Sequence, residues 1–389
     1  MPVPVRELSQ FIVLYAAIYG AFGVTSPFWP RFFEARGLTS EEIGLLFGLG
    51  TIVRLIVGPC AGRGADLLQA LRMTLGVCAI VAAGTALALL AAHGAWQLFL
   101  TQLCQAAALA PITILADALA VTAAQRDGFE YGWVRGSASA AFVIGLIAAG
   151  QILGSAGFSP MVATYAALLV GAGLAVGFVP PVTAGATIRM GAKWSAFSGV
   201  SELLREPRFR RLLMVAALIY GSHAMHDTFA IIRWNAAGIG SSSASILWSE
   251  SVAAEVVVFF VLGPWLLSRL DARGATALAA TASVVRWIVM AESTNVAALA
   301  LVQPLHGLTF ALTHLACMRL IASFVPSHLA ATAQGLYVFG PGLVTAVLTM
   351  ASGELYARFG AQGFLFMALL CAAALPVSLG LRTEANPAR

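Results

Sequence analysis

Several ionisable side chains lie in the middle of long apolar stretches of this sequence. The acids are Asp117, Asp227 and Glu255, and the bases are Arg54 and Arg286. A charge at the centre of a bilayer costs roughly 2.5–3.5 kcal/mol, so such a residue usually has a partner and a function. A carboxyl group can carry a proton, and a guanidinium can bind a carboxylate through paired hydrogen bonds. Together these side chains indicate proton transfer and anion binding.

Polar residues also gather in the apolar stretch Gln303–Arg319. Gln303, His306 and His314 fall within about 100° of one another on a helix of 3.6 residues per turn, so we expect them to share one face. His306 is titratable near neutrality and could hydrogen-bond a ligand or Glu255. For His314, an interhelical hydrogen bond is as good an interpretation as a bound ligand.

Another group of polar residues falls between positions 223 and 255. His223 and Asp227 are four residues apart and therefore share a helix face, where either a functional pair or a structural pair fits. His226 lies on a different face, and we expect it to pack against neighbouring helices. Glu250 lies nearer the end of its stretch than Glu255, where water can reach it.

Transmembrane helices must position these residues. The chain has 389 residues, of which 60% are hydrophobic and only 10% charged, and its mean hydropathy is +0.88. A soluble protein of this length needs far more charge, so we expect an all-α polytopic membrane protein. We count twelve apolar runs of about 20 residues, the length that spans a bilayer. The first run is longer than the core of a signal peptide and lacks a cleavage site, so we interpret it as a retained helix.

The distribution of charge predicts the orientation. Most of the 22 Lys and Arg residues fall in termini and loops on one side, so the positive-inside rule predicts cytoplasmic termini and a multi-pass protein of the inner (plasma) membrane. The net charge of +5 then reflects topology, and we expect no nucleic-acid partner. The five cysteines have no metal-like spacing and are expected to be free thiols. Without a Walker, HExxH or GxSxG motif, we expect no enzyme, cofactor or metal.

The two halves of the chain repeat each other. Gly58-Pro59 is followed by Asp66, and Gly263-Pro264 by Asp271, both at an offset of 205 residues. Two further matches, at Tyr19-Gly20 and at Gly37-Leu-Thr-Ser, recur at an offset of 201. This agreement indicates two six-helix halves, the layout of many secondary transporters, with a binding site near the midplane. The expected divisions are an N-terminal bundle (1–180), a basic cytoplasmic linker (181–209) with a short surface helix, and a C-terminal bundle (210–389).

Three segments carry a family resemblance. The segments ILADALAVTAAQRDGFEYGWVR, ASVVRW and QPLHGLTFALTHLACMRLIA resemble the phenylpropionate permease family of the major facilitator superfamily. The resemblance covers essentially the whole chain, and more distantly the sequence is similar to lactose-permease-like proton symporters. It implies the major facilitator fold and proton symport. The superfamily's loop motif is degenerate here, because Leu67 stands where a basic residue follows Asp66.

Resemblance to lactose permease also implies roles for residues at matching spacings. A carboxylate and an arginine 18 residues apart bind sugar there, and Asp117 and Arg135 have that spacing and a Tyr-Gly-x-x-Arg context. An arginine and a histidine 20 residues apart act in proton coupling, as Arg286 and His306 would here. Asp227 matches an aspartate of the seventh helix in its distance from a loop proline.

Two departures from lactose permease matter for the proton. Gln303 replaces a lysine, and Thr309 replaces the glutamate that is central to proton coupling. A different carboxylate must therefore take the proton, and we favour Glu255, with Asp227 second. Arg286 would either bind a substrate carboxylate or only neutralise Glu255.

These considerations give two sets of candidate residues. The proton-coupling set is Glu255, Arg286, His306 and Asp227, and the substrate-binding set is Asp117, Arg135, Arg54, His223, Gln303, His314, Tyr19 and Trp248. An inner latch is the alternative role for Asp117, Arg135 and Arg54. Packing is the alternative role for Tyr19 and Trp248.

The function expected from the sequence is import of a small organic solute by proton symport and alternating access. The resemblance implies a small aromatic carboxylate such as 3-phenylpropionate, whereas Asp117 and Arg135 also allow a sugar or a nucleoside. Two other classes stay open: an antiporter that expels lipophilic compounds, and a receptor that does not transport. The partners expected are the substrate, protons and the lipid bilayer, and a monomer suffices because one chain contains both repeats.

Overall fold

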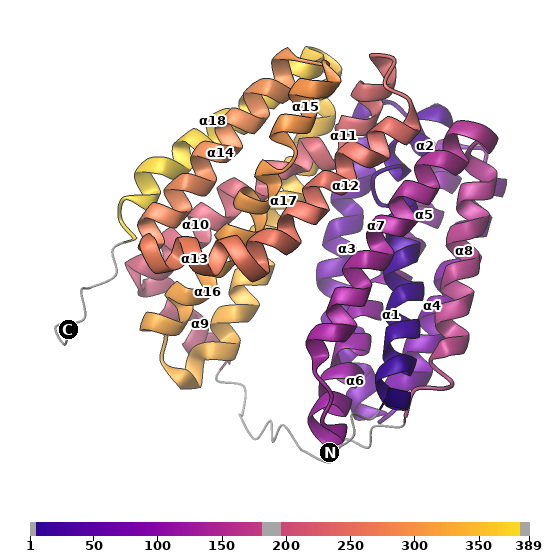
Figure 1. Ribbon diagram of the computed structural model, residues 1–389, viewed down its shortest axis with the longest axis horizontal. Coiled ribbons are helices and arrows are strands. Elements are labelled where there is room, and N and C mark those ends of the chain that lie inside the picture. The colour runs from indigo at the N-terminus through magenta and orange to yellow at the C-terminus, as the bar shows by residue number, and fades with distance from the viewer. Residues whose placement is uncertain (1–4, 181–195, 382–389) are drawn as a thin grey trace. The chain divides into compact units, whose positions relative to one another are not determined.

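The computed structural model describes residues 5–180 and 196–381, and within these ranges it is helical and has no strand (Figure 1). The α-helices are α1 (Val5–Thr25), α2 (Trp29–Ala35), α3 (Ser40–Leu67), α4 (Leu71–Ala91), α5 (Ala95–Leu109), α6 (Ile112–Asp127), α7 (Tyr131–Ala156), α8 (Phe158–Ala175), α9 (Ala196–Arg205), α10 (Pro207–Gly221), α11 (His223–Ala236), α12 (Ser241–Val257), α13 (Gly263–Arg269), α14 (Ala272–Glu292), α15 (Val296–Val302), α16 (Thr313–Phe324), α17 (Ala330–Phe359) and α18 (Gly363–Ser378). Two π-helices, η1 (Val258–Leu262) and η2 (Gly307–Leu312), and two 3-10 turns, η3 (Ser327–Leu329) and η4 (Gly360–Gln362), complete the order.

These elements make an all-α polytopic membrane protein of twelve spans. Ten helical stretches of the described residues are long and apolar enough to cross a membrane. One of them, Ser327–Ser378, contains both α17 and α18. The pair α10–α11 brings the total to twelve and is the seventh span in chain order. It is not among the ten because a turn at Ser222 divides it into two helices, each shorter than 18 residues.

Polar residues fix where several spans begin. The Thr39 hydroxyl accepts a hydrogen bond from the Glu42 amide, and the Glu42 carboxylate accepts one from the Thr39 amide, which is a capping box at the start of α3. Asp271 caps α14 through the Gly274 amide, and Asn295 caps α15. These side chains satisfy amides that have no partner within the helix.

The chain forms two compact units. The first contains residues 1–187 together with 234–249, and the second contains residues 188–233 and 250–389. Residues 234–249, which follow the seventh predicted span, thus group with the first unit. The short helix predicted in the linker corresponds to α9, which packs on α10 and α17. The predicted linker residues 181–195 lie outside the described residues.

In the first unit, α1 and α7 approach closely at glycines. A Cβ on Gly23 would lie 2.0 Å from the Phe142 carbonyl oxygen, and one on Gly145 would lie 2.4 Å from the Gly20 carbonyl oxygen. Small residues allow membrane helices to make backbone contact in this way. The contact matters for the site, because Tyr15 and Tyr19 lie on α1 and Tyr131 and Arg135 lie on α7.

In the second unit, η2 approaches α12 at another glycine. A Cβ on Gly307 would lie 2.6 Å from the Ala254 carbonyl oxygen. The neighbours of these two residues in the sequence are His306 and Glu255, so the close approach places that histidine beside that acid. The site of this unit therefore depends on a position without a side chain.

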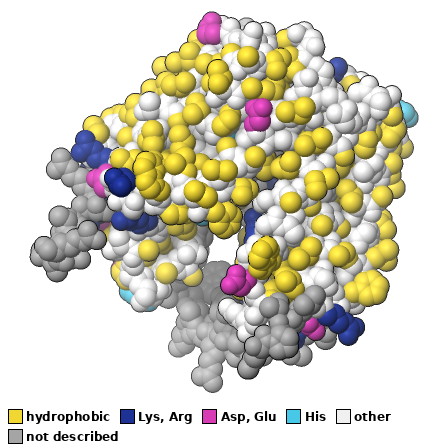
Figure 2. Space-filling view, in the orientation of Figure 1, with side chains coloured by type: hydrophobic (Ala, Val, Ile, Leu, Met, Phe, Trp, Pro, Cys, Tyr) yellow, Lys and Arg dark blue, Asp and Glu magenta, His cyan; other side chains and the backbone are white. Residues whose placement is uncertain are grey.

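Hydrophobic side chains cover most of the molecular face in Figure 2, as expected of a surface in lipid. Large apolar residues such as Trp96, Phe260 and Leu301 are more than half exposed. The five cysteines are free thiols.

Candidate functional site

Arg286 is the centre of a polar network in the second unit. Its side chain is fully buried in the middle of α14. Nη1 donates to Nδ1 of His306 (2.9 Å), and Nη2 donates to Oε1 of Gln303 (2.8 Å) and to Nε2 of His226 (3.2 Å). The guanidinium also lies 4.7 Å from the ring centre of Trp287. A charge buried this deeply requires such partners, and α11, α14 and the α15–η2 segment supply them.

The bonds of Arg286 determine the tautomers of both histidines. A guanidinium has only donors, so Nδ1 of His306 must accept and its proton must be on Nε2. That Nε2 lies 2.7 Å from Oε1 of Glu255 and donates to it. Protonating His306 at Nδ1 would turn two donors toward each other and break its bond with Arg286. His306 is therefore neutral here and links Arg286 to Glu255.

The second branch repeats this arrangement on α11. His226 accepts from Arg286 at Nε2, so its Nδ1 carries the proton and donates to Oδ1 of Asp227 over 3.2 Å. The His226 side chain is 2% exposed, whereas that of Asp227 is 55% exposed. Arg286 thus reaches a half-buried carboxylate through His306 and an exposed one through His226.

Two further contacts hold the network in place. Ser251 on α12 donates to Oε1 of Gln303 over 2.9 Å. His223 bonds Thr309 through Nε2 (2.9 Å) and the Ile219 carbonyl oxygen through Nδ1 (2.9 Å). Thr309, which stands where lactose permease has its glutamate, therefore anchors a buried histidine. His223 and Asp227 share a helix face but do not bond each other.

In the described part of the chain His314 makes no hydrogen bond with Gln303 or His306, and the π-helix η2 lies between it and His306. His314 contacts Tyr337 instead, with Nδ1 3.3 Å from the hydroxyl, and Tyr337 bonds Tyr220 over 2.8 Å. This contact is the interhelical hydrogen bond that the sequence analysis offers as one of two roles for His314.

The first unit holds a second cluster around Asp117. Tyr15 donates to Oδ1 of Asp117 over 2.5 Å, and Tyr131 donates to the same oxygen over 2.8 Å. The Tyr15 ring lies edge-on to that of Tyr131, with centroids 6.5 Å apart. Helices α1, α6 and α7 together enclose this carboxylate.

Arg135 belongs to the same cluster but makes no ion pair with Asp117 among the described residues. Its Nη1 donates to the Tyr19 hydroxyl, and its guanidinium lies over the Tyr19 ring, 5.0 Å from the centroid. Tyr19 in turn stacks on Tyr15 at 5.8 Å. Asp117 and Arg135, which the sequence matched by their spacing, are thus connected through tyrosines.

The remaining candidates lie outside both clusters. Arg54 is exposed on α3 and donates to Thr51 of its own helix (2.9 Å). Trp248 is half-buried on α12, and its ring lies 6.5 Å from that of Trp234. Glu250 has one buried carboxyl oxygen for which the described residues provide no hydrogen-bond partner.

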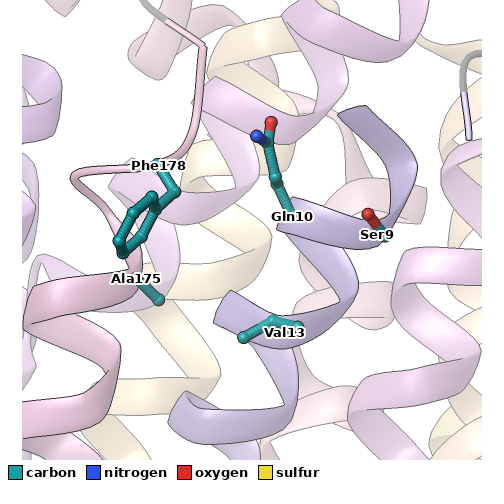
Figure 3. Close-up of a pocket in the computed structure, with 5 residues that line it drawn as sticks. All are labelled: Ser9, Gln10, Val13, Ala175 and Phe178. Carbon is teal, nitrogen blue, oxygen red and sulfur yellow. The ribbon is translucent and has the colours of Figure 1, made fainter. Parts of the chain in front are cut away.

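A pocket of about 250 Å³ opens between the first turns of α1 and the end of α8 (Figure 3). Ser9, Gln10, Val13, Ala175 and Phe178 line it. It contains no charged side chain and shares no residue with either cluster, so we do not assign a ligand to it. The described residues contain no group of three or more His, Cys, Asp or Glu side chains that could hold a metal.

His226 is the residue that the sequence interpretation missed. We expected it to pack on another face, and instead it bonds Arg286. His226 follows His223 by three residues on α11, and residues three apart on a helix are also neighbours, so the two histidines lie on adjoining parts of its surface. The signal available was its position beside Asp227.

Comparison with known proteins identifies the family and the fold of this chain. The profile of the MFS_1-like family matches residues 8–368. The chain is 33% identical to a probable 3-phenylpropionic acid transporter of Escherichia coli K12 over 394 aligned positions, which cover 98% of this chain and 99% of that protein. It is 22% identical to the uncharacterized transporter YwbF of Bacillus subtilis 168, over 83% of this chain and 80% of the relative.

Solved structures share the fold. The nucleoside transporter NupG matches with a TM-score of 0.84 and 17% identity, over 99% of this chain and all of NupG. A bacterial homologue of the human lysosomal transporter Spinster, in an inward-facing unoccupied conformation, matches with a TM-score of 0.77 and 14% identity over the whole of both chains. At these identities the similarity concerns the fold alone.

Proposed function

Because the chain belongs to the MFS_1-like family of membrane transporters, we propose that it is a proton symporter that imports a small aromatic carboxylate. The E. coli relative, named a probable 3-phenylpropionic acid transporter, supports the substrate class. The positive-inside bias supports cytoplasmic termini in the inner membrane. Import proceeds by alternating access of a monomer.

The single observation that carries the proposal is the hydrogen-bonded path from Arg286 through His306 to Glu255. With neutral histidines, Arg286, Asp227 and Glu255 sum to a charge of −1. Protonation of Glu255 brings that sum to zero, and a neutral network is cheaper to enclose in a low-dielectric interior. Glu255 is thus suited to take up one proton per cycle.

The mid-span charges of the first unit, counted with Arg54 outside the Asp117 cluster, have the opposite balance. The mid-span residues Arg54, Arg135 and Asp117 sum to a charge of +1. A monoanionic substrate brings that sum to zero as well. Proton and anion therefore neutralise the mid-span charge of separate units, so the state that carries both has the least net charge at mid-span. This balance favours movement of the two together over movement of either alone.

Proteoliposomes loaded at pH 7.5 test the proposal, with an external pH about one unit lower and radiolabelled 3-phenylpropionate outside. We expect accumulation that a protonophore abolishes. Glu255→Gln should abolish accumulation but retain exchange of labelled for unlabelled substrate, because a neutral amide mimics the protonated acid. Glu354→Gln, on an exposed acid of α17, is the matched control. Gradient-driven accumulation by Glu255→Gln would exclude Glu255 as the coupling acid.

A nucleoside or sugar is the second candidate substrate. It is favoured by Asp117, whose two tyrosine partners both bond Oδ1, since in the described part of the chain no side chain donates to Oδ2. A ligand hydroxyl could donate there. Adding uridine or lactose to the same liposomes distinguishes the two candidates. Proton uptake with either compound would identify a nucleoside or a sugar, and not an aromatic carboxylate, as the substrate class.

A further inference from the structure

We propose that Arg54 binds the carboxylate of the transported substrate. The inference rests on the proposed function and deepens it by assigning the anion to one residue. Arg54 lies on α3, 14 residues after Ser40, and therefore about 21 Å along a helix of 28 residues. This is the middle of the span, where a charge without compensation is most costly.

The Arg54 guanidinium is available to a ligand. Among the described residues its hydrogen bond goes to Thr51, one turn earlier on α3, and no acid lies within ion-pair distance. Arg54 is exposed, whereas most of the helix around it is at least half-buried. A mid-span cation that no other helix neutralises is a feature that folding alone does not explain, and a bound anion would neutralise it.

The other two mid-span arginines are already engaged. Arg286 uses both terminal nitrogens on His226, His306 and Gln303 and is fully buried. Binding a carboxylate there would require breaking those bonds. Arg135 donates to Tyr19 and lies against its ring. Arg54 alone of these three offers its paired donors without giving up an interhelical bond.

The Arg54 side chain lies beside a glycine of its own helix. Gly50 is buried one turn earlier on α3, and a Cβ there would lie 4.0 Å from Nη1 of Arg54 and 3.6 Å from the Cβ of Ala106 on α5. The guanidinium therefore folds back along α3 on the side that faces α5. These neighbours place the cation on the protein side of α3 and not on the lipid side.

The same face of α3 continues to an aromatic ring. Phe47 precedes Arg54 by seven residues, nearly two helical turns, and is half-buried with its ring edge-on to Phe33 at 5.8 Å. Thr51 lies between them and donates to the Phe47 carbonyl oxygen. The face thus offers a ring, a hydroxyl and a guanidinium in order along one helix. A phenyl group joined to a carboxylate by a short chain has matching chemistry.

Binding measurements on the purified full-length protein test this assignment. The probes are 3-phenylpropionate and its uncharged analogue 3-phenylpropionamide, and the variants are Arg54→Gln, Arg54→Lys and the control Arg63→Gln, an exposed arginine near the end of the same helix. The wild type should bind the carboxylate at least tenfold more tightly than the amide. Arg54→Gln should weaken carboxylate binding at least tenfold and leave amide binding unchanged.

Two further readouts separate binding from a structural role. Arg54→Lys should restore part of the preference for the carboxylate, because it keeps the charge but not the paired donors. The melting temperature of the ligand-free Arg54→Gln protein should equal or exceed that of the wild type, since an uncompensated charge is removed. A large loss of melting temperature in both Arg54 variants would assign Arg54 to the fold and overturn the inference.

The outcomes also distinguish this inference from the proposed function. If the wild type binds 3-phenylpropionate and Arg54→Gln binds it equally well, the carboxylate lies elsewhere and only the assignment to Arg54 is wrong. If the wild type binds neither probe, the proposed substrate class is wrong and the assignment is overturned with it.

Discussion

Replacing Gly307 with alanine is expected to uncouple transport from the proton without removing any titratable group. A Cβ at this position would lie 2.6 Å from the Ala254 carbonyl oxygen and 2.8 Å from Cγ2 of Val258. An ordinary contact begins near 3.4 Å, so η2 and α12 must separate by about 0.8 Å. Ala254 precedes Glu255 on α12, and Val258 is the first residue after α12.

The separation acts directly on the proton site. The bond from His306 to Glu255 is 2.7 Å long, and a shift of about 0.8 Å would lengthen it to about 3.5 Å, beyond a useful hydrogen bond. A hydrogen bond to a charged acceptor contributes about 1.5–3 kcal/mol. At about 1.4 kcal/mol per factor of ten, its loss corresponds to roughly a 10- to 100-fold change in the coupling equilibrium.

The assay compares gradient-driven accumulation of 3-phenylpropionate with substrate exchange in proteoliposomes. Gly307→Ala should lower accumulation at least tenfold and retain most of the exchange. Gly335→Ala is the matched control, because a Cβ on that glycine of α17 meets no atom within 4 Å. Accumulation by Gly307→Ala at the control level would refute the reasoning, as would equal losses of accumulation and exchange.

Two other predictions concern the remaining carboxylates. If one proton accompanies each monoanion, no net charge moves, and a membrane potential of 100 mV set with valinomycin should change accumulation less than twofold; Asp227→Asn should not alter this. A second proton carried on Asp227 would instead add about 2.3 kcal/mol, or roughly 50-fold, per 100 mV. Tyr131→Phe should lower the free energy of unfolding by about 1.5–3 kcal/mol, since it removes a 2.8 Å bond to Asp117. Denaturant titration in detergent measures this change, and unchanged stability would show that Tyr131 is dispensable to that carboxylate.

Much of the architecture was predictable because hydropathy depends on composition within a window of about 20 residues. The twelve spans and the short helix α9 follow from such local patterns. The internal repeat was also visible, and in the structure its two glycines, Gly58 and Gly263, both lie at close approaches to another helix. At Gly58 the neighbours are Ala110 and Ile114, at the junction of α5 and α6, and at Gly263 the neighbour on another helix is Leu315 of α16.

The partners of the mid-span charges were less predictable. The sequence matched Asp117 with Arg135 by their spacing and offered neutralisation of Glu255 as one of two roles for Arg286. In the structure, tyrosines intervene in the first case and His306 in the second. Sequence spacing specifies depth along a helix, but it does not specify which side chain of another helix reaches that depth first.

The sequence by itself determined that this is a helical membrane protein with acids and bases at mid-span, because burying a peptide group or a charge in lipid has the same cost in any fold. Only the tertiary structure decided how those charges are neutralised. The packing of the helices placed His226 against Arg286 and His314 against Tyr337. The missing side chain of Gly307 let His306 reach Glu255. Hydrogen bonds act over about 3 Å, and distances of that size between helices depend on packing, which no local pattern in the sequence records.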